Sequence, residues 1–128
     1  MRFRLHSPTQ SLFDGEARLV VAHSPEGELA VMDGHEPLLA VVASGPLRIE
    51  TSEGTRVFAV RGGILQVTRE DVTCLAHEAV AAEALDPVVL GREREALDRR
   101  IGNEEPSPEL QQERAWLAAK EKVGRAHG

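Results

Sequence analysis

The chain has 128 residues, of which 41% are hydrophobic and 28% charged, and its 21 acidic and 15 basic residues give a formal net charge of −6. This size allows one compact domain with an appendage. The acidic balance and the 3% aromatic content argue against a nucleic-acid-binding protein, which needs a basic surface or a series of aromatic rings.

Three absences bear on location. No apolar run approaches the roughly 18–20 residues of a membrane span, so we expect no direct membrane insertion and membrane contact only through a partner. The N-terminus lacks the apolar stretch of a secretory signal, and the lone Cys74 fits a reducing compartment. We therefore expect a cytoplasmic protein.

Short apolar segments separated by turn residues fill the first 85 residues, a pattern typical of a β-sandwich or β-barrel. Ser24-Pro25-Glu26-Gly27 has the proline and glycine of a tight turn, and Ser52-Glu53-Gly54 and Arg69-Glu70-Asp71 are polar breaks suited to hairpins. The expected strands are Phe3–His6, Glu16–Ala22, Leu29–Met32, Leu38–Val42, Leu47–Thr51, Val57–Val60, Ile64–Thr68 and Val72–His77.

Two of these strands, Leu38–Val42 and Val57–Val60, are apolar on both faces, whereas a free-standing antiparallel sheet normally alternates apolar with polar residues. Their outer faces therefore need a cover, which a docked partner or the appendage would supply. A tightly packed barrel is the other explanation. We expect the partner.

The pattern changes after Leu85. Asp86 suits a helix N-cap and Pro87 the first helical position, and the helix expected over Val88–Ile101 ends at Gly102-Asn103. Ser107-Pro108 repeats this start before a second helix over Leu110–Val123, which is rich in helix-forming residues. Because the intervening loop is short, the two helices should form an antiparallel hairpin.

The expected fold is mainly β with an α appendage: a flattened β-sandwich domain at residues 1–85 and a helical hairpin domain at residues 86–128. The apolar stripes of both helices are thin. A few partly buried side chains, at about 1.5–3 kcal/mol for full burial of each, barely offset the ordering of the hairpin residues at about 1–2 kcal/mol each. We expect the hairpin to be held loosely.

The pattern of reactive side chains predicts no catalytic residue, no metal ligand and no cofactor. The five histidines lack metal-ligand spacing, and adjacent pairs such as His35-Glu36 point to opposite faces of a strand. Gly62-Gly63 lacks the lysine and hydroxyl residue of a phosphate-binding loop. The alternative is a small cytosolic β-barrel metal enzyme, cupin-like, that uses His23, His35 or His77.

Residues 27–39 read Gly-Glu-Leu-Ala-Val-Met-Asp-Gly-His-Glu-Pro-Leu-Leu. This block closely resembles the signature Gly-Glu-Leu-Gly-Ile-Leu-Pro-Gly-His-Ala-Pro-Leu-Leu of the epsilon subunit of F-type ATP synthases. Three further blocks, at residues 45–49, 58–67 and 72–76, resemble the family in the same order, and the resemblance spans roughly Phe3 to Asp86. The departures are Ala30, Asp33 and Arg61, where the family usually has glycine, proline and serine, and a short hairpin.

The resemblance implies a non-catalytic subunit of the rotor. Such a subunit joins the central stalk at the cytoplasmic face of the bacterial inner membrane, binds the gamma subunit and the c-ring, and couples proton or sodium translocation to ATP synthesis. In the family, the segment from Glu28 to His35 lies near the c-ring, which makes Glu28, Asp33 and His35 the candidate c-ring contacts.

The end of the second helix is locally basic, with Arg114, Lys120, Lys122 and Arg125. Cations there favour the helix macrodipole. By resemblance, they also face an acidic segment of the catalytic alpha/beta head when the hairpin extends, and this contact restrains ATP hydrolysis.

Some family members bind ATP through a motif at the start of the hairpin. Here Val89 stands where that motif has arginine, and valine cannot replace the charge-assisted contacts of a guanidinium. We therefore interpret Asp86 as a helix cap, and a stand-alone ATP-sensing module remains a further alternative.

Overall fold

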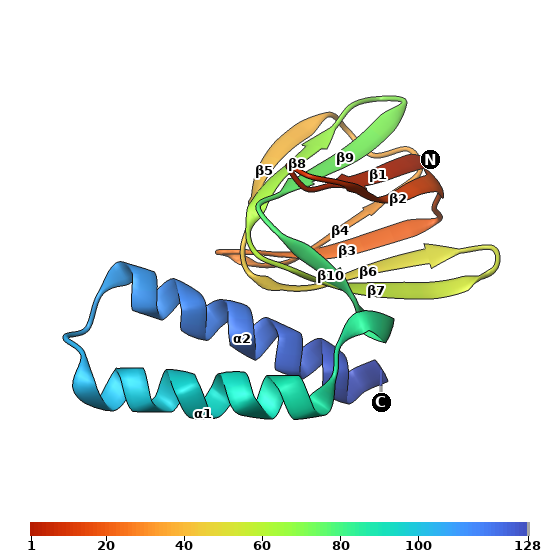
Figure 1. The fold of residues 1–128 in the computed structure, drawn as a ribbon. Coiled ribbons are helices and arrows are strands. Elements are labelled where there is room, and N and C mark those ends of the chain that lie inside the picture. The colour runs from red at the N-terminus through yellow and green to blue at the C-terminus, as the bar shows by residue number, and fades with distance from the viewer. Residues whose placement is uncertain (128) are drawn as a thin grey trace.

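The computed structural model describes the backbone of residues 1–127 and the side chains of residues 1–126. Two five-stranded β-sheets stack face to face and two helices follow them (Figure 1). The strand order is β2-β1-β9-β8-β5 in the first sheet and β10-β7-β6-β3-β4 in the second. The predicted β-sandwich with a C-terminal helical hairpin is confirmed.

The strands are β1 (Arg2–His6), β2 (Ser11–Glu16), β3 (Leu19–Ser24), β4 (Gly27–Met32), β5 (Leu38–Val42), β6 (Gly45–Thr51), β7 (Gly54–Val60), β8 (Gly63–Val67), β9 (Asp71–Ala76) and β10 (Ala79–Ala81). A 3-10 helix, η1 (Ala82–Ala84), leads to α1 (Pro87–Asn103) and α2 (Pro108–His127). No described helix combines the length and the apolar character needed to cross a membrane.

The strand predicted at Glu16–Ala22 is present as β3, but it begins at Leu19, three residues later than predicted, and Glu16 ends β2 instead. The chain leaves the first sheet at the end of β2 and enters the second sheet at β3. The two residues between these strands are held by backbone hydrogen bonds. Ala17 donates to the carbonyl of Met1 over 2.8 Å, and Arg18 donates to that of Glu50 over 2.7 Å. This corner joins the two layers at one end of the sandwich.

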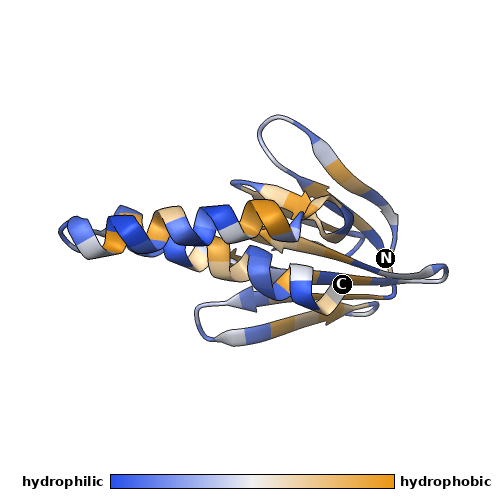
Figure 2. Ribbon diagram, turned by 60° about the horizontal axis from the view of Figure 1, so that its bottom comes forward, coloured by the Kyte–Doolittle hydropathy of each residue, from blue (hydrophilic) through white to orange (hydrophobic). Residues whose placement is uncertain are grey.

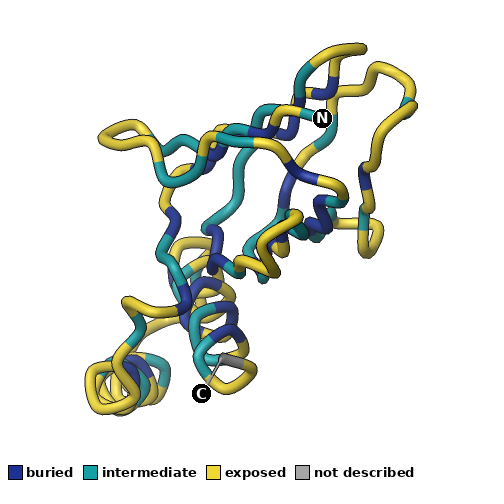
Figure 3. Tube along the Cα trace, turned by 90° about the vertical axis from the view of Figure 1, so that its right-hand side faces the viewer, coloured by how far each residue is buried: buried dark blue, intermediate teal, exposed yellow. Residues whose placement is uncertain are grey.

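The core lies between the two sheets, and buried and more exposed positions alternate along β1, β6, β8 and β9 (Figure 3). In β1, Phe3 and Leu5 point inward and are fully buried, whereas Arg2 lies outside. The other large, fully buried side chains are Phe58, Leu47, Ile49, Leu65, Val20, Val60, Val72 and Cys74, with Val123 from the hairpin.

Both helices begin with the predicted caps. The Asp86 carboxylate accepts a hydrogen bond from the Val88 amide over 2.8 Å, and Pro87 occupies the first turn. The Ser107 hydroxyl accepts one from the Leu110 amide over 3.1 Å. The cap role assigned to Asp86 is therefore confirmed.

The hairpin docks on the sandwich through α2. This helix lies against the outer face of β6 and β7, and α1 packs on the far side of α2 (Figure 1). Trp116, Ala119 and Val123 are buried in one cluster with Ala59 of β7 and Ala82. The prediction that a partner covers Val57–Val60 is wrong, because the appendage covers this strand.

The two helices are joined by buried leucines and by ion pairs. Leu90 and Leu97 of α1 form one cluster with Leu110 and Leu117 of α2, although Figure 2 shows hydrophobic and hydrophilic positions interspersed along both helices. Three pairs cross between the helices: Glu93–Lys120 at 2.6 Å, Arg94–Glu121 at 2.5 Å and Arg100–Glu113. These ion pairs hold the two helices together in addition to their few apolar contacts, and the pattern of apolar residues in the sequence did not reveal them.

Candidate functional site: an uncovered face of the sandwich

The outer face of the first sheet carries a contiguous group of exposed apolar side chains. Leu39 and Val41 of β5 are 70% and 61% exposed, Ile64 of β8 is 46% exposed and Leu75 of β9 is 50% exposed. Val41 pairs with Ile64, and Ile64 pairs with Leu75, so these side chains are neighbours across three strands. We call these four residues the apolar face.

The far half of the same face is charged. Arg2 lies 2.9 Å from Asp14 of β2, and Arg4 lies 3.2 Å from Asp71 of β9. The hydrogen bond from Arg2 holds the pKa of Asp14 below its ordinary value. An apolar centre beside polar, exposed groups is typical of a surface that binds another protein.

Sequence reasoning missed the apolar face as a set of residues. The available signal was the two-faced apolar pattern of Leu38–Val42, whose cover was expected to be a partner. Within residues 1–126 the outer side of β5 remains uncovered, and Ile64 and Leu75 extend it.

The three candidate c-ring contacts lie along the free edge of the second sheet, because β4 is its edge strand. Asp33 and His35 share the turn after β4, where Asp33 lies 2.7 Å from the Met1 ammonium and His35 donates its amide to the Met32 carbonyl over 3.3 Å. Glu28 stands near the opposite end of β4. At about 3.3 Å per residue, it is roughly 17 Å from Asp33 along the strand.

The four basic residues of the hairpin fall into two groups. Lys120 is engaged: its ammonium lies 2.6 Å from Glu93 and 5.1 Å from the centre of the Trp116 ring. Arg114, Lys122 and Arg125 are exposed on α2. Packing of α1 against α2 therefore engages one of the predicted cations and leaves three accessible.

The histidines of the cupin-like alternative are not gathered at one place. His23 has its Nδ1 atom 3.2 Å from the Pro46 carbonyl, and His77 lies beside Gly62 at the same end of the sandwich, whereas His35 lies at the opposite end. Among the described residues, no group of three or more His, Cys, Asp or Glu side chains is placed to hold a metal ion. Burial raises the pKa of the Cys74 thiol to about 12, which keeps it protonated.

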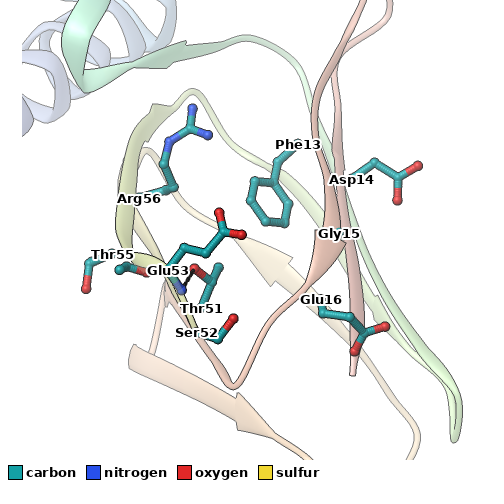
Figure 4. A pocket seen from close by; sticks show the side chains of 10 residues that line it. Phe13, Asp14, Gly15, Glu16, Thr51, Ser52, Glu53, Thr55 and Arg56 are labelled. Carbon is teal, nitrogen blue, oxygen red and sulfur yellow. Dashed lines mark hydrogen bonds between the residues drawn. The ribbon is translucent and has the colours of Figure 1, made fainter.

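A separate cavity of about 430 Å³ opens between β2 and the β6–β7 turn (Figure 4). The ring of Phe13 and the side chains of Glu53 and Arg56 point into it, and Asp14 points away (Figure 4). Its lining contains no histidine, cysteine or lysine. The cavity lies at the end of the sandwich away from the apolar face's Val41, so the two surfaces are distinct.

The fold defines a β-sandwich protein with a docked helical hairpin and an uncovered apolar face. Residues 1–82 match the family described as ATP synthase, Delta/Epsilon chain, beta-sandwich domain. The ATP synthase epsilon chain of Psychrobacter arcticus is 31% identical over 119 residues, which are 92% of this chain and 86% of that protein. The epsilon chain of Streptomyces griseus is 41% identical over 87 residues, 67% of this chain and 70% of that protein. The chain belongs to the ATP synthase delta/epsilon family.

Solved structures agree on the fold. A chain in the structure of Euglena gracilis mitochondrial ATP synthase, OSCP/F1/c-ring, has a TM-score of 0.76 at 24% identity, with 98% of this chain and 80% of that chain covered. A chain of the Tetrahymena thermophila mitochondrial ATP synthase central stalk/c-ring has a TM-score of 0.68 at 12% identity, with 96% and 95% covered. Family membership decides against the cupin-like alternative.

Proposed function

We propose that this chain is the epsilon subunit of a bacterial F-type ATP synthase. In this role it is a non-catalytic rotor part of the central stalk, at the cytoplasmic face of the inner membrane. The family match over residues 1–82 and the relatives named epsilon chain support the assignment. The observation that carries the binding function is the apolar face, because the hairpin leaves it uncovered.

The apolar face is the proposed docking surface for the gamma subunit. Full burial of a valine- or leucine-sized side chain contributes about 1.5–3 kcal/mol, and these four side chains are roughly half exposed. Covering them would contribute on the order of 3–7 kcal/mol before the cost of association. The ion-paired half of the face supplies the polar surroundings that such interfaces have.

The c-ring is proposed to contact the turn that holds Asp33 and His35. Glu28 lies on the same edge strand but about 17 Å away, so one compact loop of the ring is too small to reach all three residues. Contact with all three candidate residues therefore requires a broad surface of the ring that extends along β4. Held between gamma and the ring, the sandwich would transmit rotation and thereby couple proton translocation to ATP synthesis.

The hairpin is proposed to restrain ATP hydrolysis when α2 leaves the sandwich and reaches the catalytic alpha/beta head. Its release requires exposure of the buried Trp116 and Val123. Extension of the two helices would also break the Glu93–Lys120 pair. The docked form is therefore the resting state, and Arg114, Lys122 and Arg125 are the cations available to an acidic segment.

The gamma assignment is tested by substitution of Ile64 with aspartate. A carboxylate in the centre of an apolar interface loses hydration without gaining a partner, so Ile64→Asp should weaken the complex with the gamma subunit at least tenfold. Val89→Asp is a matched control, because Val89 is 45% exposed on α1, outside the apolar face.

The measurement is co-purification of the co-expressed subunits through gel filtration, followed by a dissociation constant for each variant. As a check that the fold is intact, each isolated variant should have the same melting curve as the unmodified chain. If Ile64→Asp stays with gamma as tightly as the unmodified chain, the apolar face is not the docking surface.

A further inference from the structure

A recess of about 540 Å³ lies where the first sheet meets the hairpin. Val41 of β5 forms part of its wall, Arg61 belongs to the turn between β7 and β8, and His77 follows β9. Gln112 of α2 completes the lining from the hairpin side. Since Val41 also belongs to the apolar face, the recess continues that face toward α2.

The recess is lined by neutral and basic residues, whereas the protein as a whole is acidic. The chain has 21 acidic and 15 basic residues, yet no carboxylate lines the recess. Four other cavities in the described part of the chain each include at least one aspartate or glutamate. Arg61, His77 and Gln112 instead present hydrogen-bond donors, so an acidic group is the chemistry that fits.

The backbone that carries Arg61 and His77 is held by a constrained turn. Gly62 has a φ of 59°, and a Cβ atom on Gly63 would lie 2.2 Å from the Leu75 carbonyl oxygen. The His77 amide donates to the Gly62 carbonyl over 3.1 Å, which keeps His77 beside the turn that carries Arg61. A backbone fixed in this way leaves only the side chains of Arg61 and His77 to be ordered when an anion binds.

Arg61 already has one acidic neighbour, Glu78, whose Oε2 atom lies 3.7 Å away. Glu78 does not line the recess. Both side chains of this pair are exposed, and an exposed pair at such a distance contributes little to stability. An incoming carboxylate in a partly desolvated interface would therefore compete well for the guanidinium.

We propose that the recess receives an acidic side chain of the gamma subunit. Arg61 is the main determinant, and His77 and Gln112 are further donors. This inference rests on the proposed function, because it assumes that gamma covers the adjoining apolar face. Gln112 belongs to α2, so gamma bound in the recess also favours the docked hairpin, and the docked hairpin favours gamma to the same extent.

The test compares the affinity of full-length variants for immobilised gamma subunit. Arg61→Glu reverses the charge and should weaken binding at least tenfold, and Gln112→Glu, which adds a carboxylate from the hairpin side, should weaken it several-fold. Arg69→Glu is the matched control, because Arg69 is an exposed turn residue at the other end of β8 and should bind like the unmodified chain. With Arg61→Ser, binding should become less sensitive to salt, since a charge contact has been removed.

Two results would overturn the inference. If Arg61→Glu and Gln112→Glu both bind like the unmodified chain while Ile64→Asp does not, gamma covers the apolar face without entering the recess, and the proposed function stands. If the unmodified chain itself does not bind gamma, the proposed function and the recess inference fail together. Trp116 emission identifies any variant whose hairpin no longer docks, and Gln112→Glu keeps the test valid if Arg61→Glu does not fold.

Discussion

Replacement of Ala59 by glutamate should detach the hairpin while the sandwich stays folded. Ala59 is fully buried on the outer side of β7, where α2 places Trp116, Ala119 and Val123 against it. The docked hairpin leaves no room and no partner for a carboxylate at this position. Undocking places the new side chain in water, on an outward-facing position of the sheet.

The two free energies that compete are of similar size. Burial of a valine contributes about 1.5–3 kcal/mol, and loss of a buried tryptophan costs about 3–5 kcal/mol, so the docking contacts are worth on the order of 5–8 kcal/mol. Burial of an unpaired carboxylate costs several kcal/mol, and the larger side chain adds steric strain. Every 1.4 kcal/mol changes the ratio of docked to undocked molecules about tenfold.

Trp116 is the only tryptophan, so its emission reports docking directly. Ala59→Glu should shift this emission toward that of an exposed indole and make α2 sensitive to protease, with the β-sheet circular dichroism retained. Ala30→Glu places the same residue on an exposed position of β4 and should change neither signal. The reasoning is refuted if Ala59→Glu unfolds sandwich and hairpin in one transition, because residues 1–85 and 86–128 would then form one cooperative unit.

Two further predictions concern the hairpin. The hydrogen bond from Arg94 holds the pKa of the Glu121 carboxyl below its ordinary value, so this pair stabilises the hairpin fully above pH 4.5 and is lost as the pH falls through the lower folded value. Trp116 emission between pH 7 and 3 should show this loss, and Glu121→Gln, which lacks the carboxyl, should abolish that part of the pH dependence. Ending the chain after Leu85 should leave a cooperative β-sheet transition and gamma binding intact while it raises ATP hydrolysis by the reassembled enzyme. An unchanged hydrolysis rate would make the hairpin a structural brace.

The features predicted best from the sequence are those that depend on residues close together in the chain. The caps at Asp86 and Ser107 and most strand positions follow from local turn chemistry and alternation. β2 was missed because Asp14-Gly15 has the composition of a turn. An edge strand tolerates these residues, since one side of it faces water.

Contacts between segments that are distant in the sequence could not be predicted from local residue patterns. Both Leu38–Val42 and Val57–Val60 have two apolar faces, and only the folded chain shows that α2 covers the second and leaves the first open. From the sequence, Lys120 was expected to be a cation available to a partner. In the structure it is paired with Glu93, which lies 27 residues earlier in the chain. Likewise, Glu28 and Asp33 belong to one sequence block, yet an extended strand places them at opposite ends of an edge.

The parallel pairing of β1 with β9 has a consequence for how the chain acquires its shape. Residues 2–6, which are synthesised well before β9, find this partner only in residues 71–75. Such a pairing closes a long loop before its contacts can compensate for the lost chain entropy, and topologies of this kind fold slowly. The first sheet therefore stays divided on the ribosome until β9 emerges, with the inner side of β1 exposing Phe3 and Leu5 to any chaperone within reach.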